Sequence, residues 1–156
     1  MSQHSARLPY HQLSSKAFMG LVNVSETIKK GPLGTRLAEL VFLRVSQINR
    51  CAFCVDMHVK EARALGESDH RLHLVAVWQE VDVFTERERA AFLWAEAVTN
   101  LTDGFVPDAV NDAVAEEFIP AEIAHLTLAI CVINSWNRLN VSMRLPGGHY
   151  ELRGHR

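Results

Sequence analysis

Four residues with chemically useful side chains lie close together in the sequence, namely Glu39, Cys51, Cys54 and His58. The two cysteines are three residues apart at the predicted start of a helix, and side chains at this spacing share one face of the helix. His58 follows Cys54 by four residues and therefore lies one turn further along that face. Amides of a first helical turn favour a thiolate, the form of cysteine that attacks peroxides and disulfides. A second thiol nearby can capture a sulfenic acid as a disulfide. The spacing therefore predicts a redox-active cysteine pair.

Three other interpretations of this motif are possible from the residues alone. A cytosolic Cys-x-x-Cys with a nearby His can bind zinc, with Glu39 as a fourth ligand, but structural zinc sites more often use two separate ligand pairs and the sequence has no second pair. A thioredoxin-type domain is disfavoured because its motif follows a strand, whereas a helix is predicted before Cys51. Two buried cysteines without a role would not require a His four residues on.

The elements that must position these residues are all predicted to be helices. Alternation with a period of two is scarce and no Asn-Gly or Asp-Gly hairpin dipeptide occurs. Apolar spacing and capping signals predict helices over about 14–30, 35–49, 52–65, 68–78, 85–98, 107–118 and 120–144. We therefore expect one all-α domain over residues 1–156, with six or seven helices, a core at about 15–144, a short N-terminal arm and a C-terminal tail.

A weak internal repeat with an offset of 86 residues connects the predicted site with the last helix. It aligns Glu39 with His125, Cys51 with Asn137, and Cys54 with Asn140. Two related helical hairpins, one active and one degenerate, would explain the repeat. Two amphipathic helices with the same apolar spacing would explain it equally well, and the sequence leaves both interpretations open.

Composition excludes several classes of function. The chain has 156 residues, 48% of them hydrophobic, and a net charge of −2, without the basic stripe of a nucleic-acid binder. The small basic group at the C-terminus (Arg153, His155 and Arg156) is expected to be a solvated tail. No secretory h-region is recognisable, and the most apolar stretch, 123–133, is shorter than the ~20 residues that cross a bilayer. We expect a cytoplasmic protein that binds neither nucleic acid nor membrane.

Residues outside the motif carry less specific predictions. His125 is expected to be a hydrogen-bonded core or interface histidine, Cys131 an inert buried thiol, and Asp56 a solvated carboxylate. The stretch 126–141 is too apolar for an exposed face and predicts a homo-oligomer.

The spacing Glu39-x11-Cys51-x2-Cys54-x3-His58 resembles the active-site signature of the AhpD-like alkyl hydroperoxidases of the carboxymuconolactone decarboxylase superfamily. The run from Ile133 to Leu139 is also similar to one in a small-protein branch of this family. The resemblance covers about residues 15–144. It implies an all-α fold with a helical pair at its core, assembled as trimers or hexamers.

This resemblance also implies residue roles. Cys54 would attack a hydroperoxide, Cys51 would resolve the sulfenic acid, and Glu39 and His58 would relay protons through a water. From the residues alone either cysteine could attack. The best-known members have His before the second cysteine, where this chain has Phe53. We expect a hydroperoxide reductase with an external dithiol or protein reductant. No Gly-rich phosphate loop predicts a bound cofactor, and no metal is predicted. The alternatives are a thiol-disulfide electron carrier between proteins and a zinc-stabilised helical module.

Overall fold

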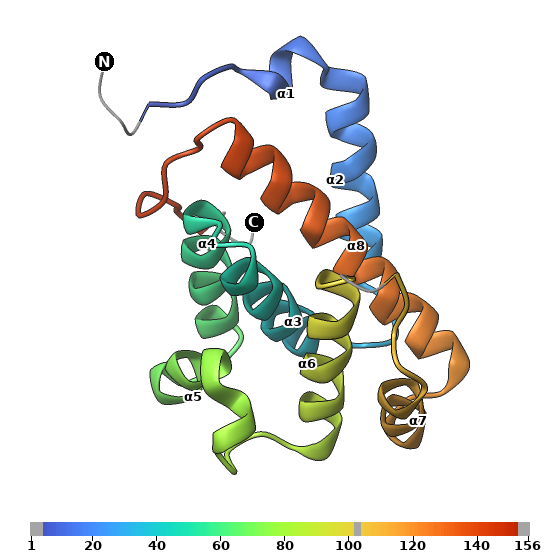
Figure 1. The fold of residues 1–156 in the computed structure, drawn as a ribbon. Helices are drawn as coiled ribbons and strands as arrows, with labels where there is room; N and C mark the ends of the chain where they lie inside the picture. Colours follow the sequence, from blue (N-terminus) through green and yellow to red (C-terminus); the bar gives the residue numbers. More distant parts are fainter. Residues whose placement is uncertain (1–4, 102–103, 153–156) are drawn as a thin grey trace.

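The computed structural model describes residues 5–101 and 104–152, and these residues form helices and no strand. The helices, shown in Figure 1, are α1 (Tyr10–Leu13), α2 (Ser15–Lys29), α3 (Thr35–Ile48), α4 (Ala52–Ala64), α5 (Asp69–Leu74), the 3-10 helix η1 (Val75–Glu80), α6 (Glu86–Thr99), α7 (Asp108–Glu117) and α8 (Pro120–Ser142). The predicted all-α fold class is confirmed, and the main helices begin and end within a few residues of their predicted bounds.

Helix α3 runs through the middle of the molecule and packs against α4, α6 and α8 (Figure 1). Apolar side chains on its opposite faces enter two separate clusters. Val41 and Phe42 join residues of α6, α7 and α8, and Leu40 and Leu43 join residues of α4, α5 and α6. Each fully buried side chain of this kind contributes about 1.5–3 kcal/mol. Because both faces of α3 are covered along its middle, Glu39 and Ser46 lie in the protein interior.

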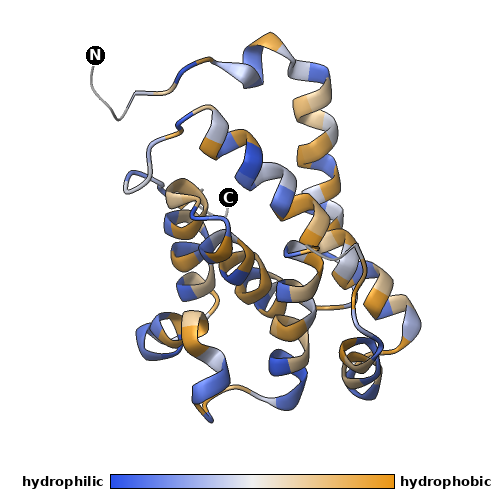
Figure 2. Cartoon of the chain, in the orientation of Figure 1, coloured by the Kyte–Doolittle hydropathy of each residue, from blue (hydrophilic) through white to orange (hydrophobic). Residues whose placement is uncertain are grey.

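The surface helices have the amphipathic pattern that such an arrangement requires. Figure 2 shows hydrophilic and hydrophobic residues interspersed along the helices. At the start of α6, Thr85 and Glu88 form the predicted capping box, in which the Thr85 hydroxyl accepts from the Glu88 amide and the Glu88 carboxylate accepts from the Thr85 amide. The predicted helix over 68–78 is shorter, because it tightens into η1 from Val75 and has non-helical dihedrals at Val77.

The second hairpin of the predicted repeat does not form. Residues 37–54 cross the break between α3 and α4, whereas the aligned residues 123–140 lie within the unbroken helix α8. The break occurs because Arg50 adopts a left-handed conformation (φ 55°), while α8 meets its first such residue only at Arg144, beyond its end. The shared apolar spacing of two amphipathic helices is therefore the interpretation that holds.

The described segments before α1 and after α8 are held against the helices, which the prediction of an arm and a tail outside the core did not anticipate. The backbone amide and the guanidinium of Arg7 donate to the carbonyls of Met143 and Ser142 at the end of α8, at 2.8 and 3.0 Å. The carboxylate of Asp56 accepts from the amides of Gly148 and Tyr150, both at 3.0 Å, so the prediction of a merely solvated Asp56 is wrong. The predicted solvated tail at 153–156 lies outside the described residues.

His125 and Cys131, both on α8, test two of the predictions about residues outside the motif. His125 is half-buried, and its Nε2 lies 3.1 Å from the Ile28 carbonyl oxygen, which confirms a hydrogen-bonded histidine. A Cβ atom at Gly31 would lie 2.0 Å from this ring nitrogen, so only glycine fits there. Cys131 is exposed, and the prediction of a buried thiol is wrong, because Cys131 shares a stripe of α8 with the exposed residues Leu128 and Ser135.

The predicted apolar face of α8 is only partly covered. Leu126 and Ile130 are fully buried, whereas Leu128 and Val141 are about half exposed. The homo-oligomer remains a prediction, which light scattering at micromolar concentration tests. No helix within residues 5–101 and 104–152 is by itself long and apolar enough to cross a membrane; α7 and α8 meet that requirement only as a pair bent by 116°.

Candidate active site

The turn between α3 and α4 places the cysteine pair. Arg50 has a left-handed φ of 55°, its amide donates to the Gln47 carbonyl at 3.1 Å, and the Cys51 amide donates to the Ser46 carbonyl at 3.0 Å. These two bonds form a Schellman motif, which ends α3 and reverses the chain. Cys51 is thereby the N-cap of α4, and Cys54 lies in its first turn. The predicted position of the pair at a helix start is confirmed.

The two cysteines form a disulfide with a Cα–Cα distance of 5.3 Å, within the usual range for such bonds. Both residues are almost completely buried. Each sulfur accepts a hydrogen bond of its own. The backbone amide of Cys54 donates to Cys51 Sγ at 3.4 Å, and Asn140 Nδ2, from α8, donates to Cys54 Sγ at 3.3 Å. The pair is therefore surrounded by donors, which favour negative charge on sulfur.

Glu39 and His58 form a buried pair between α3 and α4. His58 Nδ1 lies 2.6 Å from Glu39 Oε2, and Lys29 Nζ lies 2.6 Å from Glu39 Oε1. Burial by itself raises the pKa of Glu39, but the hydrogen bond from His58 and the charges of His58 and Lys29 together lower that pKa below its usual value. A carboxylate can only accept, so the His58 proton that it binds is on Nδ1. In a neutral imidazole, Nε2 then carries the lone pair.

The Nε2 atom of His58 is buried and has no hydrogen-bond partner among the described residues. His58 also lines a cavity of about 420 Å³. The cavity wall is largely apolar and aromatic, with side chains that include Phe18, Phe42, Phe53, Met57, Val132, Ile133 and Trp136. An unpaired imidazole nitrogen beside an apolar cavity of this size is suited to proton transfer with a small organic molecule.

Two tyrosines from the ends of the chain complete the cavity wall. The Tyr10 hydroxyl, from α1, donates to Asn140 Oδ1 at 2.7 Å. Tyr150, from the C-terminal segment, contacts the Glu61 carboxylate through its hydroxyl and lies edge-on to Phe53 with ring centroids 6.2 Å apart. Phe53 therefore provides an apolar wall at the position where the resemblance led us to expect a proton-donating His.

The sequence profile of the Carboxymuconolactone decarboxylase family matches residues 16–97. This segment contains the helical pair α3–α4 and all four residues of the predicted signature. The chain belongs to the carboxymuconolactone decarboxylase family. Its fold is AhpD-like, and the family resemblance predicted from the sequence is confirmed.

Relatives and solved structures agree with this assignment. The chain is 33% identical to the uncharacterized protein YdfG of Bacillus subtilis over 139 residues, which cover 89% of this chain and 95% of YdfG. Its sequence is 38% identical to that of a protein of unknown function from Agrobacterium tumefaciens, whose crystal structure describes it as a proposed antioxidant defence protein AhpD. The two structures have a TM-score of 0.89, and the match covers 94% of this chain and 100% of that one. The structure of the debrominase Bmp8 matches at 22% identity and a TM-score of 0.72, covering 86% and 71%, and shares the fold.

Sequence reasoning missed several residues of this family site. Tyr10 and Tyr150 lie far along the chain from the signature, and Lys29, ten residues before Glu39, lies on a different helix; no spacing connects the three with the signature. Asn140 had one signal, the offset of 86 residues that aligned it with Cys54, the residue whose sulfur it contacts. Within residues 5–101 and 104–152, no three His, Cys, Asp or Glu side chains are grouped to hold a metal ion.

Proposed function

We propose that this chain is a thiol-dependent peroxidase that reduces small organic hydroperoxides with Cys54 and Cys51. The observation that carries the proposal is the buried Glu39–His58 pair, which leaves His58 Nε2 unpaired beside the cavity, one helical turn after Cys54. Membership of the family and the bonded cysteine pair support it.

In the first step, the Cys54 thiol proton passes to His58 Nε2 through a water molecule, because the two atoms are not hydrogen-bonded to each other, and the thiolate attacks the terminal oxygen of the hydroperoxide ROOH. The S–O bond forms as the O–O bond breaks, which oxidises Cys54 to a sulfenic acid and reduces ROOH to an alkoxide. His58 returns the proton to the alkoxide, which leaves as the alcohol ROH. Glu39 holds the imidazole in the required tautomer and stabilises its protonated form.

In the second step, the Cys51 thiol attacks the Cys54 sulfur, the S–O bond breaks and water leaves. The product is the Cys51–Cys54 disulfide. An external dithiol then reduces it by two thiol–disulfide exchanges and becomes a disulfide itself. Each cycle therefore consumes one hydroperoxide and one dithiol.

Burial of the sulfurs separates this proposal from the alternative of a thiol-disulfide carrier between proteins. Cys51 and Cys54 are 1% and 0% exposed, so a disulfide on the surface of another protein cannot reach them unless the site opens. A small hydroperoxide, and the small dithiol that later reduces the disulfide, can enter the cavity beside Asn140, whose amide contacts Cys54 Sγ. We therefore place peroxide reduction ahead of protein disulfide exchange.

The direct test is consumption of an alkyl hydroperoxide in the presence of a dithiol. Cys54→Ser should abolish turnover, and Cys51→Ser should allow one reaction per chain without turnover. Cys131→Ser is the matched control, because this third cysteine is exposed on α8 and lies outside the site; it should keep full activity. Full activity of Cys54→Ser would reject the proposal.

Two further measurements separate the alternatives. A rate with a protein disulfide that exceeds the rate with hydroperoxide would favour the carrier. Stoichiometric zinc in the purified protein, together with no titratable thiols, would favour the zinc-stabilised module. The peroxidase proposal expects loss of two thiols per chain after one equivalent of peroxide, and their return after dithiol treatment.

A further inference from the structure

Asn140 is a buried side chain of α8 that contacts the cysteine pair from outside the family signature. Its Nδ2 donates to Cys54 Sγ at 3.3 Å, and its Oδ1 accepts from the Tyr10 hydroxyl at 2.7 Å. Asn140 is 4% exposed, so its amide exchanges few hydrogen bonds with water. The three groups form a chain of donors that ends on sulfur.

We propose that Asn140 is a positioning residue that stabilises the thiolate of Cys54, and that Tyr10 holds the Asn140 amide in the orientation this requires. The inference rests on the proposed function in one respect, since it assumes that Cys54 is the attacking cysteine. It gives that assignment a physical basis, because Cys51 Sγ receives only a backbone amide as its described donor.

The orientation of the amide decides the sign of its effect. With Nδ2 toward sulfur, the N–H dipole favours a negative charge on Cys54. If the amide turned over, Oδ1 would face the sulfur and accept from a thiol instead, which favours the protonated form. The Tyr10 hydroxyl, when it donates to Oδ1, opposes this rotation.

Tyr10 reaches the site because the N-terminal arm is fastened at two points. Arg7 bonds to the end of α8, two and three residues after Asn140. The Tyr10 ring packs edge-on against Phe18 of α2, with centroids 5.9 Å apart. The arm, which the sequence places outside the core, therefore belongs to the active site.

Asn137 provides a matched control one helical turn earlier on α8. It is also a buried asparagine, at 0% exposure, and it bonds to Ser46 and Asn49 instead of sulfur. Replacement of either asparagine by leucine removes a buried amide of similar size from the same helix. Only the replacement of Asn140 removes a donor to Cys54.

The experiment measures the pKa of Cys54 from the pH dependence of its alkylation by iodoacetamide. A background with Cys51→Ser and Cys131→Ser leaves Cys54 as the sole thiol, and serine keeps the N-cap of α4. Asn140→Leu should raise this thiol pKa by about one unit, the range expected for a hydrogen bond to a charged group. Tyr10→Phe should raise it by a smaller amount, and Asn137→Leu should lower the melting temperature without moving the thiol pKa.

An unchanged thiol pKa in Asn140→Leu, or an equal rise in Asn137→Leu, would overturn the inference. If Asn140→Leu does not fold, Tyr10→Phe tests the inference, because this substitution removes one oxygen and retains the ring that packs on Phe18. An unchanged thiol pKa in Tyr10→Phe would then count against the inference. Alkylation needs no peroxide. A chain that shows these shifts but consumes no hydroperoxide would therefore reject the proposed function alone, and a working peroxidase without them would reject this inference alone.

Discussion

Glu39 and Glu67 are two buried carboxylates with nearly the same environment and different partners. They are 1% and 3% exposed, and each binds two basic side chains, Lys29 and His58 for Glu39 and two arginines for Glu67. Burial raises the pKa of both, and in both the bonds and charges of the partners outweigh burial and lower it. Burial and pKa direction therefore do not distinguish them.

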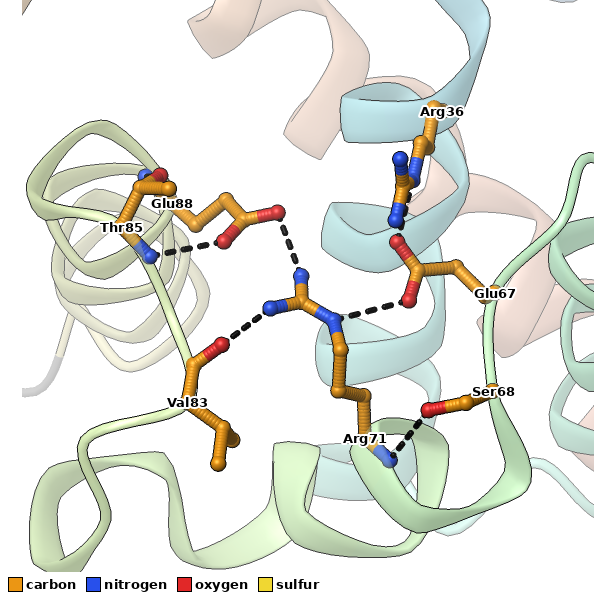
Figure 3. Close-up of polar contacts among 7 residues, drawn as sticks. All are labelled: Arg36, Glu67, Ser68, Arg71, Val83, Thr85 and Glu88. Carbon is orange, nitrogen blue, oxygen red and sulfur yellow. Dashed lines mark hydrogen bonds and ion pairs between the residues drawn. The ribbon is translucent and has the colours of Figure 1, made fainter.

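The partners do. Glu67 binds the guanidinium groups of Arg36 and Arg71, and Arg71 also bonds to Glu88 and to the Val83 carbonyl (Figure 3). Arginine stays protonated at any pH at which the protein is folded, so this network ties α3, α5 and α6 together without exchanging protons. Glu39 instead binds an imidazole, whose second ring nitrogen has no partner among the described residues and can accept a proton, and that imidazole lines a cavity. The carboxylate suited to catalysis is therefore the one whose partner keeps an unpaired ring nitrogen beside a cavity.

Replacement of Glu39 by Gln should give the largest effect on activity. The amide oxygen of the new side chain still accepts from His58 Nδ1, and Lys29, about one third exposed, can turn toward water, so we expect a stability loss of only about 1 kcal/mol. A neutral amide cannot stabilise a protonated imidazole, and peroxide turnover should fall by roughly 10²–10⁴-fold. Turnover and urea unfolding of the same preparation check both values. Turnover close to that of the wild type would remove Glu39 from the mechanism.

Replacement of Glu67 by Gln should give the opposite result. Arg71 is largely buried and would lose one of its two carboxylate partners, and loss of one member of a buried ion pair costs about 3 kcal/mol. Turnover per folded molecule should stay at the wild-type value, because no residue of this network lines the cavity. Thermal unfolding and turnover at 25 °C measure the two effects. A large loss of turnover in the folded variant would contradict the division between the two carboxylates.

The lowered pKa values of Glu39 and Glu67 also make the stability of the fold depend on pH. A carboxyl group whose pKa is lower in the folded than in the unfolded chain stabilises the fold above its unfolded pKa, about 4.3 for Glu. That stability is lost as the pH falls through the lowered folded pKa. Wild-type stability should therefore decrease below about pH 4, and Glu67→Gln and Glu39→Gln should each reduce the slope. Urea unfolding between pH 2.5 and 7 measures this, and equal slopes in all three proteins would contradict it.

The sequence was sufficient for the fold class and for the residues that lie within one signature. Helix bounds followed from local signals, such as Gly31-Pro32 after α2 and the capping box at Thr85, which act within a few residues. Cys51, Cys54 and His58 share one helix and its cap, so their spacing alone predicted their alignment.

Other parts of the site depend on contacts between distant segments. Asp56 looked solvated because nothing in α4 shows that the segment after Gly147 returns to it. That return needs a close approach, since a Cβ at Gly147 would lie 2.7 Å from the Ala52 carbonyl carbon. Lys29 is only ten residues from Glu39 in the sequence, but its contact depends on how α2 packs against α3. Local patterns predict elements and motifs, whereas contacts between segments far apart in the sequence depend on how the helices pack.

The turns at Cys51 and at Glu67 differ in the residue that adopts the left-handed conformation. Cys51 and Glu67 are each the last residue of a Schellman motif. Their backbone amides donate the 6→1 bonds, to the carbonyls of Ser46 and Ala62. The left-handed residue is Gly66 (φ 91°) before Glu67, but Arg50 (φ 55°) before Cys51. A side chain in this conformation costs about 1–2 kcal/mol, so the turn that carries the cysteines is strained and the turn that carries the structural carboxylate is not.

Two substitutions in these turns, Arg50→Gly and Gly66→Ala, should change the stability least and in opposite directions. Arg50→Gly relieves the left-handed strain but adds the entropy of a glycine in the unfolded chain, so we expect a net gain of about 0.5 kcal/mol. Gly66→Ala meets no atom within 4 Å, so its loss of about 1 kcal/mol comes from the backbone conformation alone. Thermal unfolding should show a rise of about 1–2 °C and a fall of about 3 °C, on the order expected for a domain of this size. Destabilisation by Arg50→Gly would mean that the Arg50 side chain makes a contribution to this turn larger than the strain it imposes.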